Sequence, residues 1–159
     1  MTTQLIKSHD LQPDRQAELL QPCVFAAINL ALALKQVHWN LRGSKFQTVH
    51  EFLDVVIAHA RKTSDELAER MVTLGVPARG QAQAAAQSAD KAGQSKVPDA
   101  FITDVQAVQI STELIAAAVG ALRDAQESLA EIDAVTEDLV IGAIQTFEKQ
   151  LWMLRSHLM

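Results

Sequence analysis

Apolar side chains recur every three or four residues along four long stretches of the chain, which is the spacing of one face of an α-helix. These stretches cover about residues 15–42, 45–74, 103–130 and 137–159. Long alternations of Val, Ile, Thr and Tyr, which favour strands, are missing from the sequence. The pattern therefore predicts an all-α protein with four long helices.

Turn and capping residues indicate where these helices begin and end. Gly43 is expected to end the first helix, and Ser44 with Gln47 has the spacing of a capping box for the second. Because one or two residues separate these long helices, they must fold back on each other as an antiparallel hairpin. Thr103 and Gln106 repeat the capping-box spacing where the third helix is expected to begin.

The remaining segments connect the helices. Residues 77–98 are rich in Ala, Gln, Gly and Ser, and residues 81–87 within them could form one short helix. Residues 131–136 form a polar break before the fourth helix. The order predicts a ferritin-like four-helix bundle with a short extra helix in the long crossover between helices two and three. We expect one ferritin-like domain over residues 1–159, beginning with a short tail at 1–13.

Composition and charge narrow the class of protein. A chain that is 48% hydrophobic and 21% charged is typical of a soluble globular protein, and its formal charge of −5 offers no attraction to nucleic acid or anionic membranes. The single cysteine, Cys23, is interpreted as a core residue in a reducing compartment. We see no signal peptide and no apolar run near the ~20 residues that span a bilayer. These features predict a cytoplasmic protein without membrane contact.

Candidate metal ligands share one face of the second helix. At about 100° per residue, and with His50 taken as zero, Asp54, Asp65 and Glu69 lie at about 40°, 60° and 100°. The hairpin brings His38 of the first helix to a level similar to that of His50. Imidazole nitrogens and carboxylate oxygens together suit iron, and carboxylates help to neutralise Fe(III). The spacing therefore indicates an iron site.

A structural alternative exists for each of these residues. Taken alone, a His or Asp on a long helix is usually solvated, and aligned acids often pair with a nearby Lys or Arg. Arg61 lies on the same stripe, so a helical scaffold with a surface ion-pair network and no metal is a competing interpretation. Two histidines and three carboxylates on one face favour the metal site over this alternative.

The spacing of the acids indicates that two chains are needed. Asp54 and Asp65 are eleven residues apart, which is about 16 Å along a helix, so one pair of metal ions cannot contact both. If two copies of this helix pack antiparallel about a two-fold axis, Asp54 faces the partner's Asp65 and His50 faces the partner's Glu69. One such isologous contact closes two identical sites. The predicted site therefore lies between two copies of the chain.

The same residues resemble the signature of a known family. The runs His38-Trp-Asn-x-x-Gly, Phe46, His50-x-x-x-Asp54 and Asp65-x-x-x-Glu69-Arg70 are similar to the motif of Dps proteins, the dodecameric mini-ferritins of bacteria. The closing helix, with Glu148-Lys-Gln-Leu-Trp152, is similar too. The resemblance covers nearly the whole chain, and all five ligand positions carry the expected residue type.

The resemblance implies both the ligands and the reaction. It implies two irons per ferroxidase site, held by His38, His50 and Asp54 of one subunit together with Asp65 and Glu69 of its two-fold mate. Family members oxidise Fe(II), usually with hydrogen peroxide rather than dioxygen, and store ferric mineral in a hollow shell of twelve subunits. Trp39 would quench a stray one-electron oxidant in this scheme, or else pack at the subunit interface.

The sequence departs from the family where many members bind DNA. Those members use a Lys-rich terminal extension, whereas residues 1–16 hold only Lys7 and Arg15 as basic side chains and the chain stops at Met159, directly after the last helix. Since phosphate neutralisation dominates non-specific affinity for DNA, we expect weak or no DNA binding. A DNA-compacting nucleoid protein is kept as the alternative function, and association with the nucleoid is left open.

Several other polar residues have no certain role. Acidic side chains cluster where the third and fourth helices meet, at Glu131, Asp133, Glu137 and Asp138. They either line an acidic pore that attracts Fe(II) or are ordinary solvated acids near a helix N-terminus. His59 lies opposite the metal stripe, and neither His59 nor His157 is assigned to the site.

Overall fold

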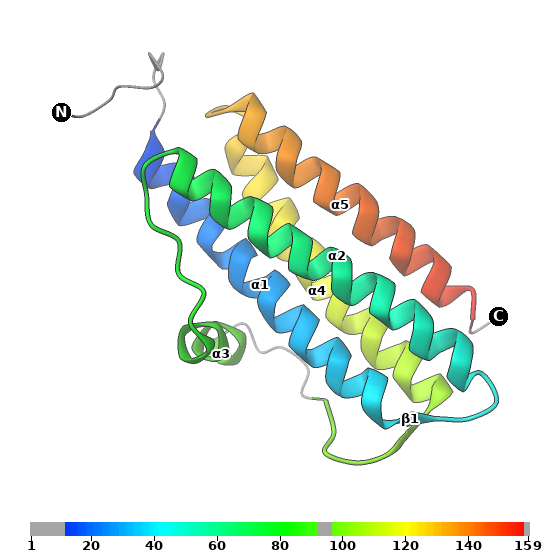
Figure 1. The fold of residues 1–159 in the computed structure, drawn as a ribbon. Coiled ribbons are helices and arrows are strands. Elements are labelled where there is room, and N and C mark those ends of the chain that lie inside the picture. The colour runs from blue at the N-terminus through cyan, green and yellow to red at the C-terminus, as the bar shows by residue number, and fades with distance from the viewer. Residues whose placement is uncertain (1–11, 92–96, 158–159) are drawn as a thin grey trace.

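The predicted ferritin-like four-helix bundle is confirmed by a computed structural model, which describes residues 12–91 and 97–157. Its elements are α1 (Pro13–Asn40), β1 (Leu41–Arg42), α2 (Phe46–Thr73), α3 (Ala82–Lys91), β2 (Ile102–Thr103), α4 (Asp104–Leu129) and α5 (Ala134–Arg155). Figure 1 shows α1, α2, α4 and α5 running along one another, while the short α3 of the crossover stands beside α1. The expected tail at 1–13 lies almost entirely outside the described residues.

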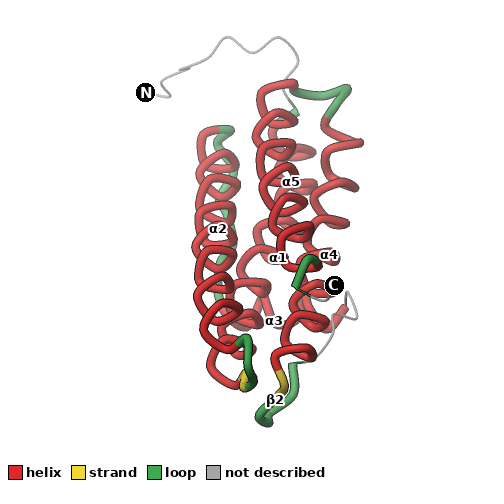
Figure 2. Tube along the Cα trace, turned by 90° about the vertical axis from the view of Figure 1, so that its right-hand side faces the viewer, coloured by secondary structure: helices red, strands yellow, loops and turns green. Residues whose placement is uncertain are grey.

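The first hairpin turn differs from the prediction. Helix α1 ends at Asn40, and the next two residues form β1, which pairs in parallel with β2 so that Leu41 faces Ile102 and Arg42 faces Thr103. A two-residue strand is too short to show a sequence period, so neither strand could be predicted. The pairing ties the end of the crossover to the hairpin turn, and Figure 2 shows β2 at that end of the bundle.

The predicted capping box at the start of α2 is wrong. The N-cap residue is Lys45, and no side chain of its own segment caps the helix. Instead, Asp104 of α4 accepts a hydrogen bond of 2.8 Å from the Lys45 amide. Ser44 and Gln47 do not form the expected capping box, because the carboxylate of Asp104, 59 residues after Lys45, accepts the hydrogen bond at this helix start instead.

The capping box at the start of α4 is confirmed. The Gln106 amide donates to the Thr103 hydroxyl at 3.2 Å, and the Thr103 amide donates to the Gln106 side chain at 2.9 Å. The predicted short helix of the crossover is also present, but it extends to Lys91, so it is longer than residues 81–87. A hydrogen bond of 2.8 Å from the Asn29 side-chain amide to the Ala85 carbonyl joins this crossover helix to α1.

The bundle core is built from large aliphatic side chains with few aromatics. Fully buried members include Leu20, Leu34, Leu53, Leu67, Ile115, Leu122, Phe147 and Leu154. Burying each contributes about 1.5–3 kcal/mol, which is the main stabilising term of such a bundle. Cys23 is buried among them, as predicted, and its thiol donates to the Ala121 carbonyl. Burial raises the pKa of Cys23 to about 12, so this thiol stays protonated and unreactive.

Two core helices have the length and mean composition of a membrane span, although neither contains an uninterrupted apolar run of ~20 residues. Among the described residues, α1 and α4 are long enough to cross a bilayer and contain windows with mean hydropathy of 1.7 and 1.4. In the bundle, 61% of the α1 window and 44% of the α4 window are buried. Core helices of soluble bundles share this composition, so packing accounts for the apolar side chains.

Helix α5 begins three residues earlier than predicted because Asp133 caps it. The Asp133 carboxylate accepts from the Val135 amide at 3.1 Å and pairs with Arg70 at 2.6 Å. Thr136, expected in a polar break, is fully buried and accepts a hydrogen bond of 2.9 Å from Arg70. Burial raises the pKa of Asp133, but hydrogen bonds from Thr136 and Arg70 outweigh it and hold that pKa below its ordinary value.

Asp133→Ala is expected to lower the free energy of unfolding by roughly 2–3 kcal/mol at neutral pH, because the cap is lost and Arg70 loses its anion. Since the folded-state pKa of Asp133 is depressed, its contribution is present above the unfolded pKa of ~3.9 and is lost as pH falls through the folded pKa. Chemical unfolding at fixed protein concentration should therefore show the difference from wild type shrinking at low pH. The exposed Asp124→Ala is the control, and a difference that persists unchanged in acid would contradict this account.

Candidate metal centre

Two histidines lie against each other where the first hairpin closes. The rings of His38, near the end of α1, and His50, in the first turns of α2, stack with centroids 3.6 Å apart and an interplanar angle of 20°. His38 Nδ1 lies 2.9 Å from the His50 carbonyl oxygen, and His50 Nδ1 lies 3.0 Å from the His38 carbonyl oxygen. Because a carbonyl only accepts, each ring donates through Nδ1 and keeps the Nε2 lone pair for a metal ion.

Burial keeps His38 in the neutral form that binds metal ions. His38 is only 5% exposed, and burial lowers its pKa, so the ring is neutral at neutral pH. Phe46 covers the His50 ring with centroids 4.8 Å apart. A neutral imidazole whose other nitrogen is hydrogen-bonded is the form in which histidine binds metal ions.

Asp54 lies beside this histidine pair, and the three predicted ligands of one subunit, His38, His50 and Asp54, are called the half-site. The Oδ1 atom of Asp54 lies 3.6 Å from His38 Nδ1 and 2.5 Å from the ammonium nitrogen of Lys35. The hydrogen bond from Lys35 is the main reason why the pKa of Asp54 lies below its ordinary value. Half of the Asp54 side chain remains exposed, so the carboxylate opens onto the surface.

The observed ion pair involves a different cation from the one expected. Arg61 was the predicted competitor for the acids of α2, whereas Lys35 of α1 pairs with Asp54. Lys35 precedes His38 by three residues, which places both on one side of α1. That spacing is a signal in the sequence of α1, outside the helix that carries the acids.

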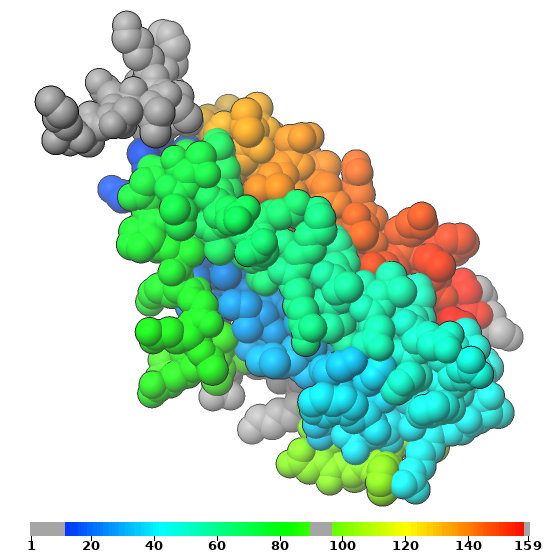
Figure 3. All heavy atoms as spheres, viewed as in Figure 1, coloured from blue at the N-terminus to red at the C-terminus, as the bar shows by residue number. Residues whose placement is uncertain are grey.

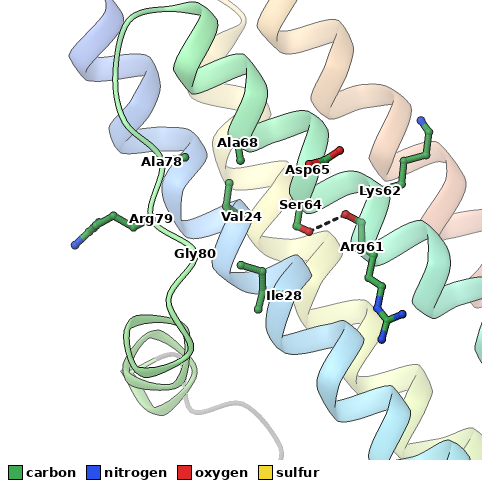
Figure 4. A pocket seen from close by; sticks show the side chains of 10 residues that line it. All are labelled: Val24, Ile28, Arg61, Lys62, Ser64, Asp65, Ala68, Ala78, Arg79 and Gly80. Atoms are coloured by element: carbon green, nitrogen blue, oxygen red, sulfur yellow. Dashed lines mark hydrogen bonds between the residues drawn. The ribbon is translucent and has the colours of Figure 1, made fainter.

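The other two predicted ligands lie elsewhere on the same helix. Asp65 and Glu69 are exposed on α2, and Asp65 lines a pocket of about 620 Å³ between α1, α2 and the start of the crossover. Figure 4 shows Val24, Ile28 and Asp65 around this pocket. In residues 12–91 and 97–157 of one chain, no three His, Cys, Asp or Glu side chains converge as a metal site.

Exposed apolar side chains border the half-site. Leu32 lies one turn before Lys35 on α1 and is 60% exposed, and Val55 follows Asp54 on α2 and is 56% exposed. Trp39, next to His38, is 66% exposed. Figure 3 shows the molecular surface over α2, with part of α1 visible between α2 and α3. Exposed apolar side chains that form a contiguous patch are typical of a surface that another protein covers.

The acids at the α4–α5 corner do not form a uniform set. Asp133 pairs with Arg70 and caps α5, as an acid at a helix N-terminus can, and a pore lined by this cluster stays a prediction. Glu137 accepts a hydrogen bond of 2.7 Å from Gln126. Glu131 and Asp138 are exposed to solvent.

Two of the three unassigned histidines, His59 and His157, lie away from the half-site, and the third, His9, is outside the described residues. His59 packs against Phe147 of α5 with centroids 4.2 Å apart, and burial lowers its pKa. This position agrees with the prediction that His59 lies opposite the metal stripe. His157 lies beyond α5, with its ring 6.4 Å from that of Phe52.

This arrangement of helices defines a known class of protein. Residues 18–159 match the family described as ferritin-like domain. Dps from Microbacterium arborescens in its high iron form superimposes with a TM-score of 0.88 and 33% identity, over 97% of this chain and 98% of that chain. Mycobacterium smegmatis Dps superimposes with a TM-score of 0.85 and 30% identity, over 92% of this chain and 88% of that one.

Sequence comparisons narrow the class further. The DNA protection during starvation protein of Mycolicibacterium smegmatis is 34% identical over 142 residues, covering 89% of this chain and 76% of the relative. The fine tangled pili major subunit of Haemophilus ducreyi is 32% identical, covering 89% of this chain and 74% of the relative. The chain belongs to the Dps family of ferritin-like proteins, as the motif predicted. This is a family of iron-binding, oligomeric proteins associated with iron storage and DNA protection.

Proposed function

We propose that the protein oxidises Fe(II) at a di-iron site shared by two copies of the chain and stores the ferric product inside a hollow dodecamer in the bacterial cytoplasm. The observation that carries this proposal is the histidine pair: His38 and His50 each donate through Nδ1, and Asp54 stands beside them. Three donor side chains suited to iron therefore lie together, with Asp54 half-exposed at the surface. Membership of the Dps family supports the same function.

A second chain would complete the site. Two iron ions need more donors than His38, His50 and Asp54 provide, and the exposed Asp65 and Glu69 have no part in this half-site within one chain. An antiparallel contact between two α2 helices brings Asp54 of one copy opposite the partner's Asp65 and His50 opposite the partner's Glu69. The exposed Leu32 and Val55 beside the half-site would be covered by the same contact.

The reaction uses the two irons as substrates. Each Fe(II) gives up one electron, and hydrogen peroxide accepts two as its O–O bond breaks: 2 Fe²⁺ + H₂O₂ + 2 H₂O → 2 FeO(OH) + 4 H⁺. Two neighbouring irons deliver both electrons together, so no hydroxyl radical is released. The carboxylates stabilise the higher charge of Fe(III), and Trp39, exposed beside His38, would intercept a stray one-electron oxidant or pack against the partner. Dioxygen could serve as a slower oxidant.

Anaerobic titration with Fe(II), followed by hydrogen peroxide, tests this function. The ferric absorbance should rise until about two irons are oxidised per peroxide consumed, as the balanced reaction requires, and a spin trap should report little hydroxyl radical. Particle mass measured in parallel should correspond to an assembled shell. If iron oxidation matches that of protein-free buffer, the chain is no ferroxidase and the ion-pair scaffold becomes the better interpretation.

Lys35 provides a test that separates the metal site from that scaffold. Its ammonium group, 2.5 Å from Asp54, holds the carboxylate that iron would need and adds a positive charge beside the site. Lys35→Met should therefore tighten Fe(II) or Co(II) binding by roughly 3–10-fold, because the ammonium group no longer competes with the metal ion for Asp54. Loss of this ion pair should cost the fold only ~0–1 kcal/mol. Binding is measured by anaerobic equilibrium titration, with Lys62→Met as the matched control on α2. Unchanged metal affinity together with a clear loss of thermal stability would indicate a purely structural ion pair.

A further inference from the structure

The turn that joins the two histidine-bearing helices is held from outside by the end of the crossover. β1 pairs with β2 on one side of the turn, and the Arg42 guanidinium lies 3.2 Å from the centre of the Phe101 ring. The next residue, Gly43, has φ of +144°, a backbone conformation that other residues rarely adopt. A Cβ atom there would also overlap the carboxyl group of Asp104. Gly43 is therefore required by the close approach of Asp104.

Asp104 links the start of α4 to the start of α2. Its Oδ2 accepts from the Lys45 amide at 2.8 Å, and its Oδ1 accepts from the Val105 amide at 2.9 Å. The hydrogen bond from the Lys45 amide is the main reason why the pKa of Asp104 is lowered, and the Ser44 side chain also contributes. The carboxylate is therefore ionised and bonded to both helix starts at neutral pH.

This contact replaces the missing cap of α2. The first amides of a helix lack partners within the helix, and an anion there is favoured by the helix dipole. Lys45 is the N-cap residue and has no side-chain cap of its own, so Asp104 supplies both the acceptor and the negative charge. His50 follows little more than one turn later, which means that the position of this first turn decides where its ring stands.

We propose that Asp104 is a positioning residue for the His38–His50 pair, an inference that rests on the proposed function of that pair. The two hydrogen bonds of 2.9 and 3.0 Å between the rings and the opposite carbonyls require α1 and α2 to keep one relative placement. The turn between α1 and α2 is short and contains the flexible residue Gly43, so it does not by itself fix how the two helices are placed. Asp104 of α4 supplies this restraint through its hydrogen bond from the Lys45 amide. Loss of this restraint lets the rings leave the stacked, mutually hydrogen-bonded arrangement in which both Nδ1 atoms are engaged and both Nε2 atoms are kept for metal ions.

Binding of Co(II), a spectroscopic probe for the Fe(II) site, tests this role in the assembled protein. Asp104→Ala should weaken Co(II) binding by about 10–100-fold, the usual effect of losing a group that orients a metal ligand, and should alter the visible Co(II) spectrum. Asp104→Asn keeps an acceptor of the same shape and should restore most of the affinity. Asp104→Glu displaces the acceptor by one methylene, so its Co(II) affinity should lie between those of the Ala and Asn variants. If the Ala variant does not assemble, the Glu variant provides the test.

The control is Asp99→Ala, because Asp99 lies on the same segment but contacts Gln36 of α1, at 3.4 Å. This variant should bind Co(II) like wild type, and all four variants should keep the particle mass of the parent. Wild-type affinity and spectrum in both Asp104→Ala and Asp104→Glu would overturn the positioning role and leave the proposed function intact. A wild-type protein that neither binds Co(II) nor oxidises Fe(II) would overturn the proposed function and this inference with it.

Discussion

Co-assembly of an Asp54→Ala chain with a Glu69→Ala chain should recover about a quarter of wild-type iron oxidation, although each variant alone is inactive. Asp54 belongs to the half-site with His38 and His50, while Glu69 lies farther along α2 and would complete the site of the partner. In a mixed dimer, one of the two sites carries both substitutions and the other carries neither.

The expected quarter follows from random pairing. With equal amounts of the two chains, about half of the dimers are mixed, and one of the two sites in each mixed dimer is intact. Activity is measured as the initial rate of ferric absorbance after subunits have been exchanged in mild denaturant and reassembled. Exchange itself is verified by mass spectrometry of the intact dimers.

A second mixture serves as the matched control. His50→Ala and Asp54→Ala affect the same half-site, so every site in a mixed dimer of these two chains remains damaged. This mixture should stay as inactive as its parents. Recovery in both mixtures, or in neither despite proven exchange, would show that the site is not divided between chains as proposed.

The double variant His50→Ala, Asp54→Ala should lose the protection of DNA against iron and peroxide almost completely. The wild-type site removes Fe(II) and peroxide together, which is the chemistry that otherwise releases hydroxyl radical near DNA. The substitutions delete two donors from the half-site, and disturbing even the groups that support a metal ligand commonly costs 10–100-fold in affinity or activity. Conversion of supercoiled to nicked plasmid measures the effect, and Lys62→Met serves as a control for assembly and surface charge.

Neither the wild type nor the double variant should bind DNA. The formal charge is −5 per chain, and an assembly of twelve would carry about −60, which repels the phosphate backbone. A gel shift at near-physiological salt should therefore show no retardation. This outcome separates chemical protection from the alternative of a DNA-compacting nucleoid protein. Retarded DNA, or protection that survives loss of the site, would favour the alternative.

Much of the fold follows from local pattern. We could predict the four helices, the tight first hairpin, the long crossover and its short helix. Each depends on apolar residues at helical spacing and on turn residues that are close together in the chain. The Thr103–Gln106 capping box belongs to the same class of local signal. Of the site, the grouping of His38, His50 and Asp54 was predictable because helix geometry and a short turn determine it.

The features that escaped prediction depend on contacts between distant segments. The β1–β2 pairing and the Asp104 cap join residues about 60 positions apart, so nothing in the hairpin sequence reveals them. Asp133 looked like one of several solvated acids because its partner, Arg70, comes from α2. The place of Asp65 and Glu69 in a shared site stays a prediction, since it depends on a second chain.

Anomalous X-ray scattering at the iron edge from crystals loaded anaerobically with Fe(II) tests the central claim most directly. The account predicts iron peaks at the contact between two copies, bounded by His38, His50 and Asp54 of one chain and by the partner's Asp65 and the partner's Glu69. The nearest protein atoms should include the Nε2 atoms of both histidines, with Lys35 no longer bonded to Asp54. Iron found only inside single bundles or at the α4–α5 corner, with none at this contact, would contradict the account.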